Sequence, residues 1–480
     1  MGIVIKTIEN LGQYYVYDRS TNHVLRIDKN QYSELKKVET GTIPETQSAV
    51  VDEFKRKGFF LKNTLQEIEH PYTGMIKHVL DSHIEMLTLQ VTQRCNLRCK
   101  YCTYSGKYDN YNRTHANYDM TWDVAQQAVD FYLQHSVAAE TLNIGFYGGE
   151  PLLNLNLIKK TVHYIQNKVA NRKVLFSLTT NATLLTLDTA RYLFENGFSI
   201  LISLDGSKEQ HNQYRIFSDG SGSFDVIMKN LEIIKQEFPD DYKTLSFNAV
   251  INPGNDFNHL KNYFQRDKIL GDADVMASIV DDFTPNSIEL GHNFYRARAF
   301  EQFKLYLFML NKLSVTEISK LVLLNAAEIE QRYRGLLNHR RLPRKSHHAG
   351  PCIPGAKRLF INVFGDLFPC ERVGEKSPVM KIGTLEDGFD YDKIEELLNI
   401  GKISEENCKG CWAFHFCNLC CQQADKGKCL SKMKKLSYCA GAKENAYKEL
   451  QELCVLREMG CAFNKGENGF YEKVGLSVDI

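Results

Sequence analysis

The sequence predicts an α/β protein in which a central parallel sheet is flanked by two smaller domains. Between about residues 86 and 251, short apolar runs alternate with amphipathic helical patterns, which is the arrangement of a parallel sheet covered by helices. The first 80 residues instead pattern as strands followed by helices, and residues 351–480 are rich in cysteine and glycine. A chain of 480 residues is also long enough for about three domains.

The N-terminal region, residues 1–80, is predicted to be a winged-helix-like domain. GQYYVYD and HVLRI, within residues 12–27, alternate aromatic or branched side chains with polar ones, which predicts a hairpin. Helical patterns follow at about 29–38 and 44–57, and FFLK at 59–62 is expected to return as a strand. A purely structural cap would fit the same order of elements.

Composition and charge limit the classes of partner. Hydrophobic residues make up 43% and charged residues 24% of the chain, the balance of a soluble globular protein. The net charge of +1 gives no electrostatic reason to expect nucleic acid as a partner. No apolar run long enough to span a membrane and no secretory signal pattern is present in the sequence, so we expect a cytoplasmic protein without a membrane partner.

Fourteen cysteines fall into two groups, because none lies in residues 1–94 or 103–351. In a reducing cytosol, clustered cysteines are metal ligands more often than disulfides. The first group places Cys95, Cys99 and Cys102 as CxxxCxxC directly after an apolar strand, at the edge where α/β folds place their sites. Three thiolates on one loop can bind three irons of a cubane and leave the fourth open. A zinc site would need a fourth Cys or His close by in the sequence, and none stands there.

At these residues the sequence resembles the radical S-adenosylmethionine (SAM) superfamily, whose motif has an aromatic residue before the last cysteine, here Tyr101. The resemblance covers about residues 86–280. It implies a partial (β/α)6 radical SAM barrel over residues 81–290 and a [4Fe-4S] cluster whose open iron binds SAM. One electron then splits SAM to give a 5′-deoxyadenosyl radical.

The same resemblance implies a SAM site built from the ends of successive strands. In YGGEP, Gly148 and Gly149 are expected to let the backbone approach SAM, and Glu150 to meet its ammonium group. A surface salt bridge is the alternative for Arg215, and a turn position is the alternative for Asn181. The residues implied to contact SAM are Tyr101, Gly148, Gly149, Glu150, Asn181, Ser203 and Arg215.

The second cysteine group resembles the SPASM extension of radical SAM maturases, which binds two auxiliary [4Fe-4S] clusters through seven cysteines. A zinc ribbon is the alternative for such a pattern. By this resemblance, one cluster is held by Cys408, Cys411, Cys417 and Cys439, and the other receives three ligands from Cys352, Cys370 and Cys421. The chain would then hold three [4Fe-4S] clusters. Cys420, Cys429, Cys454 and Cys461 receive no assignment.

Two positions depart from the sulfatase maturases of this family. The Asp that takes the substrate proton there is replaced by Glu371, which we expect to be the catalytic residue here. The cysteine that completes the Cys352 cluster there is replaced by Arg358, whose guanidinium cannot act as a thiolate. We therefore expect an open iron that can take a substrate cysteine, unless Cys420 or another unassigned cysteine closes the cluster.

Residues 291–350 change to long helical patterns and are predicted to form a helical bridge to the SPASM domain at 351–480. His347 and His348 follow a basic loop, so they are expected to be solvated rather than to act as ligands.

Together these features predict a maturase of a ribosomally made peptide. The leader of the precursor peptide would bind residues 1–80 as an added strand, which raises the local concentration of the core peptide at the radical site. The enzyme would join a cysteine sulfur to a carbon as a thioether, with electrons from a donor such as flavodoxin or ferredoxin. Two alternatives are an anaerobic sulfatase-maturase-like formylglycine-forming enzyme and a non-enzymatic iron-sulfur scaffold or regulator with a DNA-binding winged helix.

Overall fold

The computed structural model describes residues 2–107, 111–169, 172–270, 273–280, 292–336, 341–348, 350–461 and 463. Their strands are β1 (Ile5–Asn10), β2 (Gln13–Asp18), β3 (His23–Ile27), β4 (Glu67–Ile68), β5 (Met86–Thr92), β6 (Thr141–Gly148), β7 (Lys173–Thr180), β8 (Phe198–Ser203), β9 (Ser246–Ile251), β10 (Val275–Ile279), β11 (Lys345–Ser346), β12 (Leu359–Ile361), β13 (Asp366–Phe368), β14 (Gly383–Thr384) and β15 (Gly388–Phe389). Their α-helices are α1 (Lys29–Glu39), α2 (Ala49–Arg56), α3 (Ile76–Ser82), α4 (Trp122–Gln134), α5 (Leu155–Lys168), α6 (Leu187–Glu195), α7 (Lys208–Tyr214), α8 (Phe224–Glu237), α9 (Phe257–Arg266), α10 (His292–Met309), α11 (Lys320–Leu323), α12 (Asn325–Leu336), α13 (Tyr391–Leu398), α14 (Glu405–Lys409), α15 (Lys432–Ser437) and α16 (Cys439–Glu458).

The N-terminal sheet has the order β1-β2-β3, with both pairs antiparallel. The hairpin of β2 and β3 and the helices α1 and α2 agree with the sequence prediction. The strand expected at 59–62 is absent, and β1 takes its place in the sheet. The reason is that Phe60 is fully buried and its backbone N–H donates to the carboxylate of Asp18 at 3.0 Å, so this donor is not available to a sheet.

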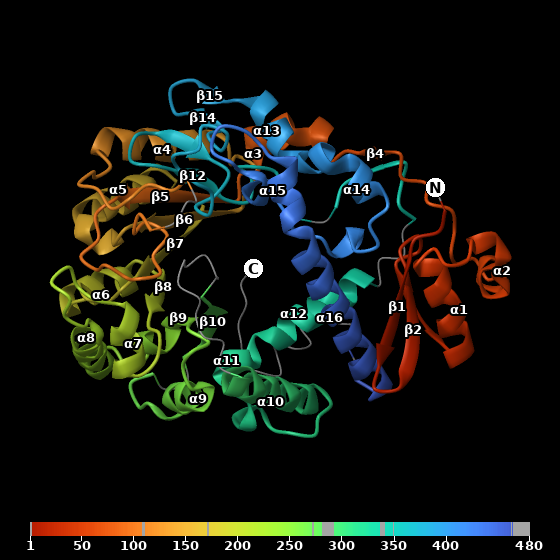
Figure 1. Cartoon of the computed structure of the whole chain (residues 1–480). Coiled ribbons are helices and arrows are strands. Elements are labelled where there is room, and N and C mark those ends of the chain that lie inside the picture. Colours follow the sequence, from red (N-terminus) through yellow and green to blue (C-terminus); the bar gives the residue numbers. More distant parts are fainter. Residues whose placement is uncertain are drawn as a thin grey trace.

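Both faces of this sheet are covered. One face packs on α1 and α2 through Ile5, Val16 and Leu35, all buried. The other face packs on α16, where Ile8 and Tyr17 join a second buried cluster. Figure 1 shows α16 running beside β1 and β2, with α1 and α2 on the opposite side.

The central sheet confirms the predicted α/β fold. Strands β5 to β10 lie side by side in chain order, and every adjacent pair is parallel. The arc of these six strands has helices on its outer side (Figure 1), and branched and aromatic side chains such as Ile144, Phe146 and Ile202 are buried between the layers. These strands and helices form the partial (β/α)6 barrel.

The cysteine-rich region continues the same sheet. Strand β12 pairs in parallel with β5 and antiparallel with β13, so the order runs from β10 to β5 and on through β12, β13, β14 and β15. Because β5 leads directly into the first cysteine motif, this pairing joins the two cysteine groups through one sheet. Helices α10 to α12 lie between barrel and cysteine-rich region in the chain.

The prediction that His347 and His348 are solvated is wrong. They are 7% and 2% exposed, because β11 pairs in parallel with β4 and draws this segment inward. The ring Nε2 of His347 then accepts the backbone N–H of Gly401 at 2.8 Å. None of the helices in the described ranges is both long and apolar enough to cross a membrane.

Candidate functional site

The first cysteine motif lies on the loop that leaves the C-terminal end of β5. Backbone hydrogen bonds fix this loop against the C-terminal end of α7 and the segment that follows it. The N–H of Arg98 donates to the carbonyl of Ile216 at 2.7 Å, and that of Lys100 donates to the carbonyl of Tyr214, the last residue of α7, at 3.0 Å. The sulfur of Cys95 accepts the N–H of Leu97 at 3.4 Å. These contacts fix the path of the loop between Cys95 and Cys102.

The three cysteines of this loop are half-buried, and their thiols act on one another electrostatically. Burial raises the pKa of Cys95 to about 12 and that of Cys99 to about 11. The pKa of Cys102 is also raised by burial. A metal must therefore displace protons from these thiols to bind them, as iron does when it coordinates thiolates.

His115 is a neighbour of this motif that the sequence did not reveal. Its Nε2 lies 3.8 Å from the sulfur of Cys102, although 13 residues separate the two. Burial lowers the pKa of His115 to about 4, so the ring is neutral near pH 7. Among the described residues, no three His, Cys, Asp or Glu side chains are arranged to hold a single metal ion.

Gly148 and Gly149 bring the end of β6 against the cysteine loop. A Cβ at Gly148 would lie 2.1 Å from the carbonyl oxygen of Thr92, and one at Gly149 would lie 2.0 Å from that of Arg94. The N–H groups of Gly149 and Glu150 donate to these same carbonyls at 3.0 and 2.8 Å. Here the two glycines allow backbone to approach backbone, a packing role that the sequence argument did not include.

Glu150 is held in a buried polar network with Asn181. It is 1% exposed, and its carboxylate accepts the N–H of Leu152, the hydroxyl of Thr180 and the N–H of Asn181 at 3.1, 2.7 and 2.8 Å. The side chain of Asn181 donates to Asn96, on the cysteine loop, at 2.9 Å. Burial raises the pKa of Glu150.

Arg215 lies inside the protein rather than on its surface. Its Nε lies 2.9 Å from the carboxylate of Asp205, and the hydroxyl of Tyr101 donates to the same carboxylate. Its guanidinium lies 5.4 Å from the ring centre of Tyr101 and acts to lower the pKa of Cys99 against the larger effect of burial. Arg215 is thus held against Tyr101 of the cysteine loop. Ser203 is buried at the end of β8, two residues before Asp205.

Asp205 is a second residue that the sequence argument did not select. Its carboxylate also accepts the N–H of Val250 at 3.0 Å, so it ties β9 to the Arg215 pair. The sequence signal was available, because SLDG places an acidic residue directly after the fourth barrel strand.

The cysteines expected to hold one auxiliary cluster gather around α14 and the start of α16. Burial raises the pKa of Cys411 and raises that of Cys417 to about 11, with neighbouring thiols of this group adding to both shifts. Cys408 is buried within α14, and Cys439 is the first residue of α16. The grouped residues are Cys408, Cys411, Cys417 and Cys439.

A lysine is buried against these thiols. Lys435 is 1% exposed, and its ammonium donates to the hydroxyl of Ser404 at 2.8 Å and to the sulfur of Cys408 at 3.8 Å. A buried ammonium without a carboxylate is costly, whereas four thiolates around iron carry net negative charge. This arrangement fits an iron-sulfur cluster at Cys408, Cys411, Cys417 and Cys439.

The cysteines expected to hold the other auxiliary cluster also come together, with Cys420 among them. Cys370 lies just after β13, and burial raises its pKa to about 12, with Cys420 and Cys352 adding to the shift. Cys420 and Cys421 share a hydrogen bond between their side chains. Cys420 therefore lies with Cys352, Cys370 and Cys421 in one group of cysteines.

Glu371 is near this site but is already paired. Its carboxylate forms an ion pair with Arg358, the residue that stands in place of a cysteine. The other carboxylate oxygen is buried and has no hydrogen-bond partner in the described part of the chain, and its charge acts to raise the pKa of Tyr147. No disulfide joins any of the fourteen cysteines, all of which lie within the described residues.

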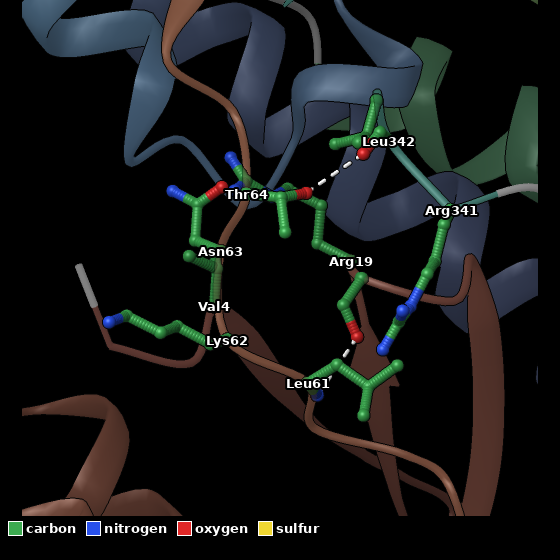
Figure 2. A pocket seen from close by; sticks show the side chains of 9 residues that line it. Val4, Arg19, Leu61, Lys62, Asn63, Thr64, Arg341 and Leu342 are labelled. Carbon is green, nitrogen blue, oxygen red and sulfur yellow. Dashed lines mark hydrogen bonds between the residues drawn. The ribbon is translucent and has the colours of Figure 1, made fainter. Parts of the chain in front are cut away.

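Two side chains of the N-terminal region bind the backbone of the CKGC turn, which carries Cys408 and Cys411; we call this set of contacts the Arg19 clamp. Arg19, 2% exposed, donates to the carbonyl oxygens of Lys409 and Cys411 at 2.7 and 3.1 Å. Asn63 donates to the same Lys409 carbonyl at 2.9 Å. Figure 2 shows Arg19 in a small pocket where Thr64 bonds the carbonyl of Leu342 at 2.9 Å. Hydrogen bonds therefore join the N-terminal region directly to the CKGC turn.

Residues 89–266 match the model of the Radical SAM superfamily. The chain therefore contains a radical SAM domain, the class of enzyme domain to which the barrel and the cysteine loop also point. Homology to an anaerobic sulfatase-maturating enzyme extends beyond that domain and covers 79% of the chain.

Two curated relatives and one solved structure describe this similarity. The chain is 30% identical over 213 residues to the radical SAM cyclopropyl synthase TigE of Paramaledivibacter caminithermalis, covering 42% of this chain and 43% of that protein. It is 26% identical over 396 residues to a cysteine-type anaerobic sulfatase-maturating enzyme of Clostridium perfringens, covering 79% of this chain and 99% of that enzyme. The structure of native anSMEcpe with bound AdoMet and Cp18Cys peptide superposes with a TM-score of 0.55 at 21% identity, covering 78% of this chain and 97% of that one.

The matched region spans less than half the length of the first relatives, including TigE. The solved structure supports the fold alone. The match to the Clostridium perfringens enzyme leaves about a fifth of this chain outside it.

Proposed function

We propose that the chain is a radical SAM maturase that modifies a ribosomally made precursor peptide, whose leader pairs with the free edge of the N-terminal sheet. The observation that carries this proposal is the edge of β3. Both faces of the sheet are covered, and β1 is engaged, since Thr7 and Glu9 bond side chains of α1 and α16 through their backbones. In the described ranges, no hydrogen bond from another element reaches the backbone of residues 24–27.

An extended leader on β3 would find unpaired backbone groups and a sheet fixed to the catalytic body. Main-chain hydrogen bonds would supply affinity in the manner of strand addition. Because Arg19 and Asn63 attach the same domain to the CKGC turn, the leader would be held at a set distance from the cysteine sites. That is the condition for a high effective concentration of the tethered core peptide.

At the radical site, Cys95, Cys99 and Cys102 would hold the cluster that cleaves SAM to a 5′-deoxyadenosyl radical, which abstracts a hydrogen from the core peptide. Glu150 has three donors, and a carboxylate offers about four acceptor positions, so one position remains for the ammonium group of SAM. Arg215, Asn181 and Ser203 would line the same site. Electrons would come from a carrier such as flavodoxin or ferredoxin.

The auxiliary region would serve the bond-forming step. With Cys420 beside Cys421, Cys352 and Cys370, the second auxiliary cluster would carry the electron released when the carbon radical joins a cysteine sulfur. Glu371 would take the proton of the substrate through its unpartnered oxygen, with Arg358 fixing the side chain. A thioether is the product that this arrangement supports.

A sulfatase-maturase-like formylglycine-forming activity is the second candidate. The match to almost the full length of the Clostridium perfringens enzyme favours it. The fifth of this chain outside that match argues for an added recognition function.

Hydrogen exchange tests the leader proposal without disturbing the Arg19 clamp, which deletion of residues 1–80 would break. The probe is a precursor peptide encoded beside the gene for this chain, compared with its core segment alone. Exchange at residues 23–27 should slow with the full precursor and stay unchanged with the core segment, while β1 stays unchanged in both. Equal protection of β1 and β3, or none, would refute leader pairing at this edge. Loss of two hydrogens together with loss of one titratable thiol and no new carbonyl identifies the thioether. Formation of a carbonyl at a cysteine or serine identifies the second candidate.

A further inference from the structure

Lys435 occupies an unusual electrostatic position. It is 1% exposed, and its ammonium contacts Ser404 and Cys408, at 2.8 and 3.8 Å. It forms no ion pair with a carboxylate in the described part of the chain. Burial of an ammonium group without a compensating charge is strongly unfavourable, because the lost hydration energy is large compared with the net stability of a domain.

The positions of Ser404, Cys408 and Lys435 on α14 and α15 follow from the local sequence. Ser404 directly precedes α14, and Cys408 follows it by four residues, so both face the same side of the helix turn. On the opposing element, α15 begins after Ser431, whose hydroxyl accepts the N–H of Lys434. The side chain of Lys434 turns to the carbonyl oxygen of Asp425, while Lys435 turns inward to the thiols.

Two histidines that lie near this ammonium carry no negative charge. The nearby imidazoles of His347 and His348 remain neutral, because burial lowers their pKa values to about 4 and about 2. The thiol of Cys439 points to the backbone carbonyl of Lys435 at 3.9 Å. The ammonium thus contacts one hydroxyl and the sulfur of Cys408, and the sulfur of Cys439 lies against the backbone of the same residue.

We propose that Lys435 is the built-in counter-charge of the auxiliary cluster on Cys408, Cys411, Cys417 and Cys439, and that it raises the reduction potential of this cluster. The inference rests on the proposed cluster assignment. A [4Fe-4S] cluster with four thiolates has a net charge of about −2 when oxidised and −3 after it gains one electron. A fixed positive charge at contact distance stabilises the reduced form more than the oxidised form, because the Coulomb energy scales with the charge.

Lys435 is a positioning residue in this proposal and does not touch the peptide. Its test is an EPR-monitored redox titration of the anaerobically reconstituted full chain, with iron measured per chain. The variants are Lys435→Met, which removes the charge at similar length, and Lys435→Arg, which keeps it. Lys432→Met is the matched control, because Lys432 is exposed on the same helix α15 and loses the same charge.

The midpoint potential of one auxiliary cluster should become more negative in Lys435→Met and stay near the wild-type value in Lys435→Arg and Lys432→Met. The other two clusters are internal references whose midpoints should not move. Loss of one cluster's iron in Lys435→Met, with retention in Lys435→Arg, would also support the charge role.

Two results would overturn the inference. One is full iron and unchanged midpoints in Lys435→Met. The other is equal loss of iron in Lys435→Met and Lys435→Arg, since shape rather than charge would then be what Lys435 supplies. Failure of the cluster assignment itself is distinguishable, because the unsubstituted chain would then bind only about eight irons.

Discussion

Substitution of Gly149 by alanine is expected to remove the SAM cluster selectively. The added Cβ would lie 2.0 Å from the carbonyl oxygen of Arg94, 2.5 Å from its carbonyl carbon and 3.0 Å from the Cβ of Cys95. Cβ contacts shorter than 3.0 Å are essentially never found, so the backbone of the cysteine loop must move by at least about 1 Å. Such overpacking costs about 3 kcal/mol, which corresponds to more than about a hundredfold in cluster retention.

The assay is iron and sulfide content after anaerobic reconstitution, together with 5′-deoxyadenosine formation. Wild-type protein should hold about twelve irons and Gly149→Ala about eight, since three [4Fe-4S] clusters become two. Gly74→Ala is the matched control, because no atom lies within 4 Å of a Cβ at Gly74. A Gly149→Ala protein with all three clusters and normal SAM cleavage would refute the argument that this glycine packs the loop.

Other outcomes concern the clamp, the second auxiliary site and pH. Arg19→Met should lower the free energy of unfolding, measured by denaturant titration, by about 2 kcal/mol, because two charge-assisted hydrogen bonds are lost. Arg26→Met removes an exposed guanidinium on β3 and should change this free energy little. Equal effects of the two substitutions would contradict the clamp. In Cys420→Ala, one auxiliary cluster should lack a protein ligand, so added cysteine should alter its Mössbauer spectrum. Added cysteine should leave the spectra of wild type and Cys429→Ala unchanged. A changed spectrum in wild type would instead support an open iron. Burial lowers the pKa of His211 to about 3, below its unfolded value of about 6.5, so the unfolded state binds more protons and stability falls as pH drops through this window. From pH 7 to 5 the loss should be about 2 kcal/mol and should disappear in His211→Gln; an unchanged pH slope in that variant would remove His211 as the cause.

The barrel was predictable because its signals are local. Each strand from β5 to β9 is a short apolar run followed by an amphipathic helix, and the register then follows from parallel pairing. The grouping of the cysteines was also predictable from the sequence, because the spacing of cysteines on one loop limits which thiols can lie together. The N-terminal sheet was harder: β1 resembles an ordinary N-terminal segment, and the loss of the strand at 59–62 depends on Phe60 donating to Asp18, a contact that the sequence does not announce.

Within the site, tertiary contacts decided what the sequence left open. His115 reaches Cys102 across 13 residues, and Asp205 pairs with Arg215 inside the protein. Lys435 is one of several lysines in its segment, and only packing distinguishes it from its exposed neighbours. Such pairings depend on how the loops fold over one another, which residue spacing does not specify.

The central claim is that Cys95, Cys99 and Cys102 hold the cluster that cleaves SAM. The most direct measurement is anaerobic incubation of the reconstituted chain with SAM and dithionite, followed by quantification of 5′-deoxyadenosine in wild type and in a variant with all three cysteines changed to alanine. The account predicts 5′-deoxyadenosine from wild type and none above background from the variant, which should still hold about eight irons in its auxiliary clusters. Undiminished 5′-deoxyadenosine formation by the triple variant would contradict it.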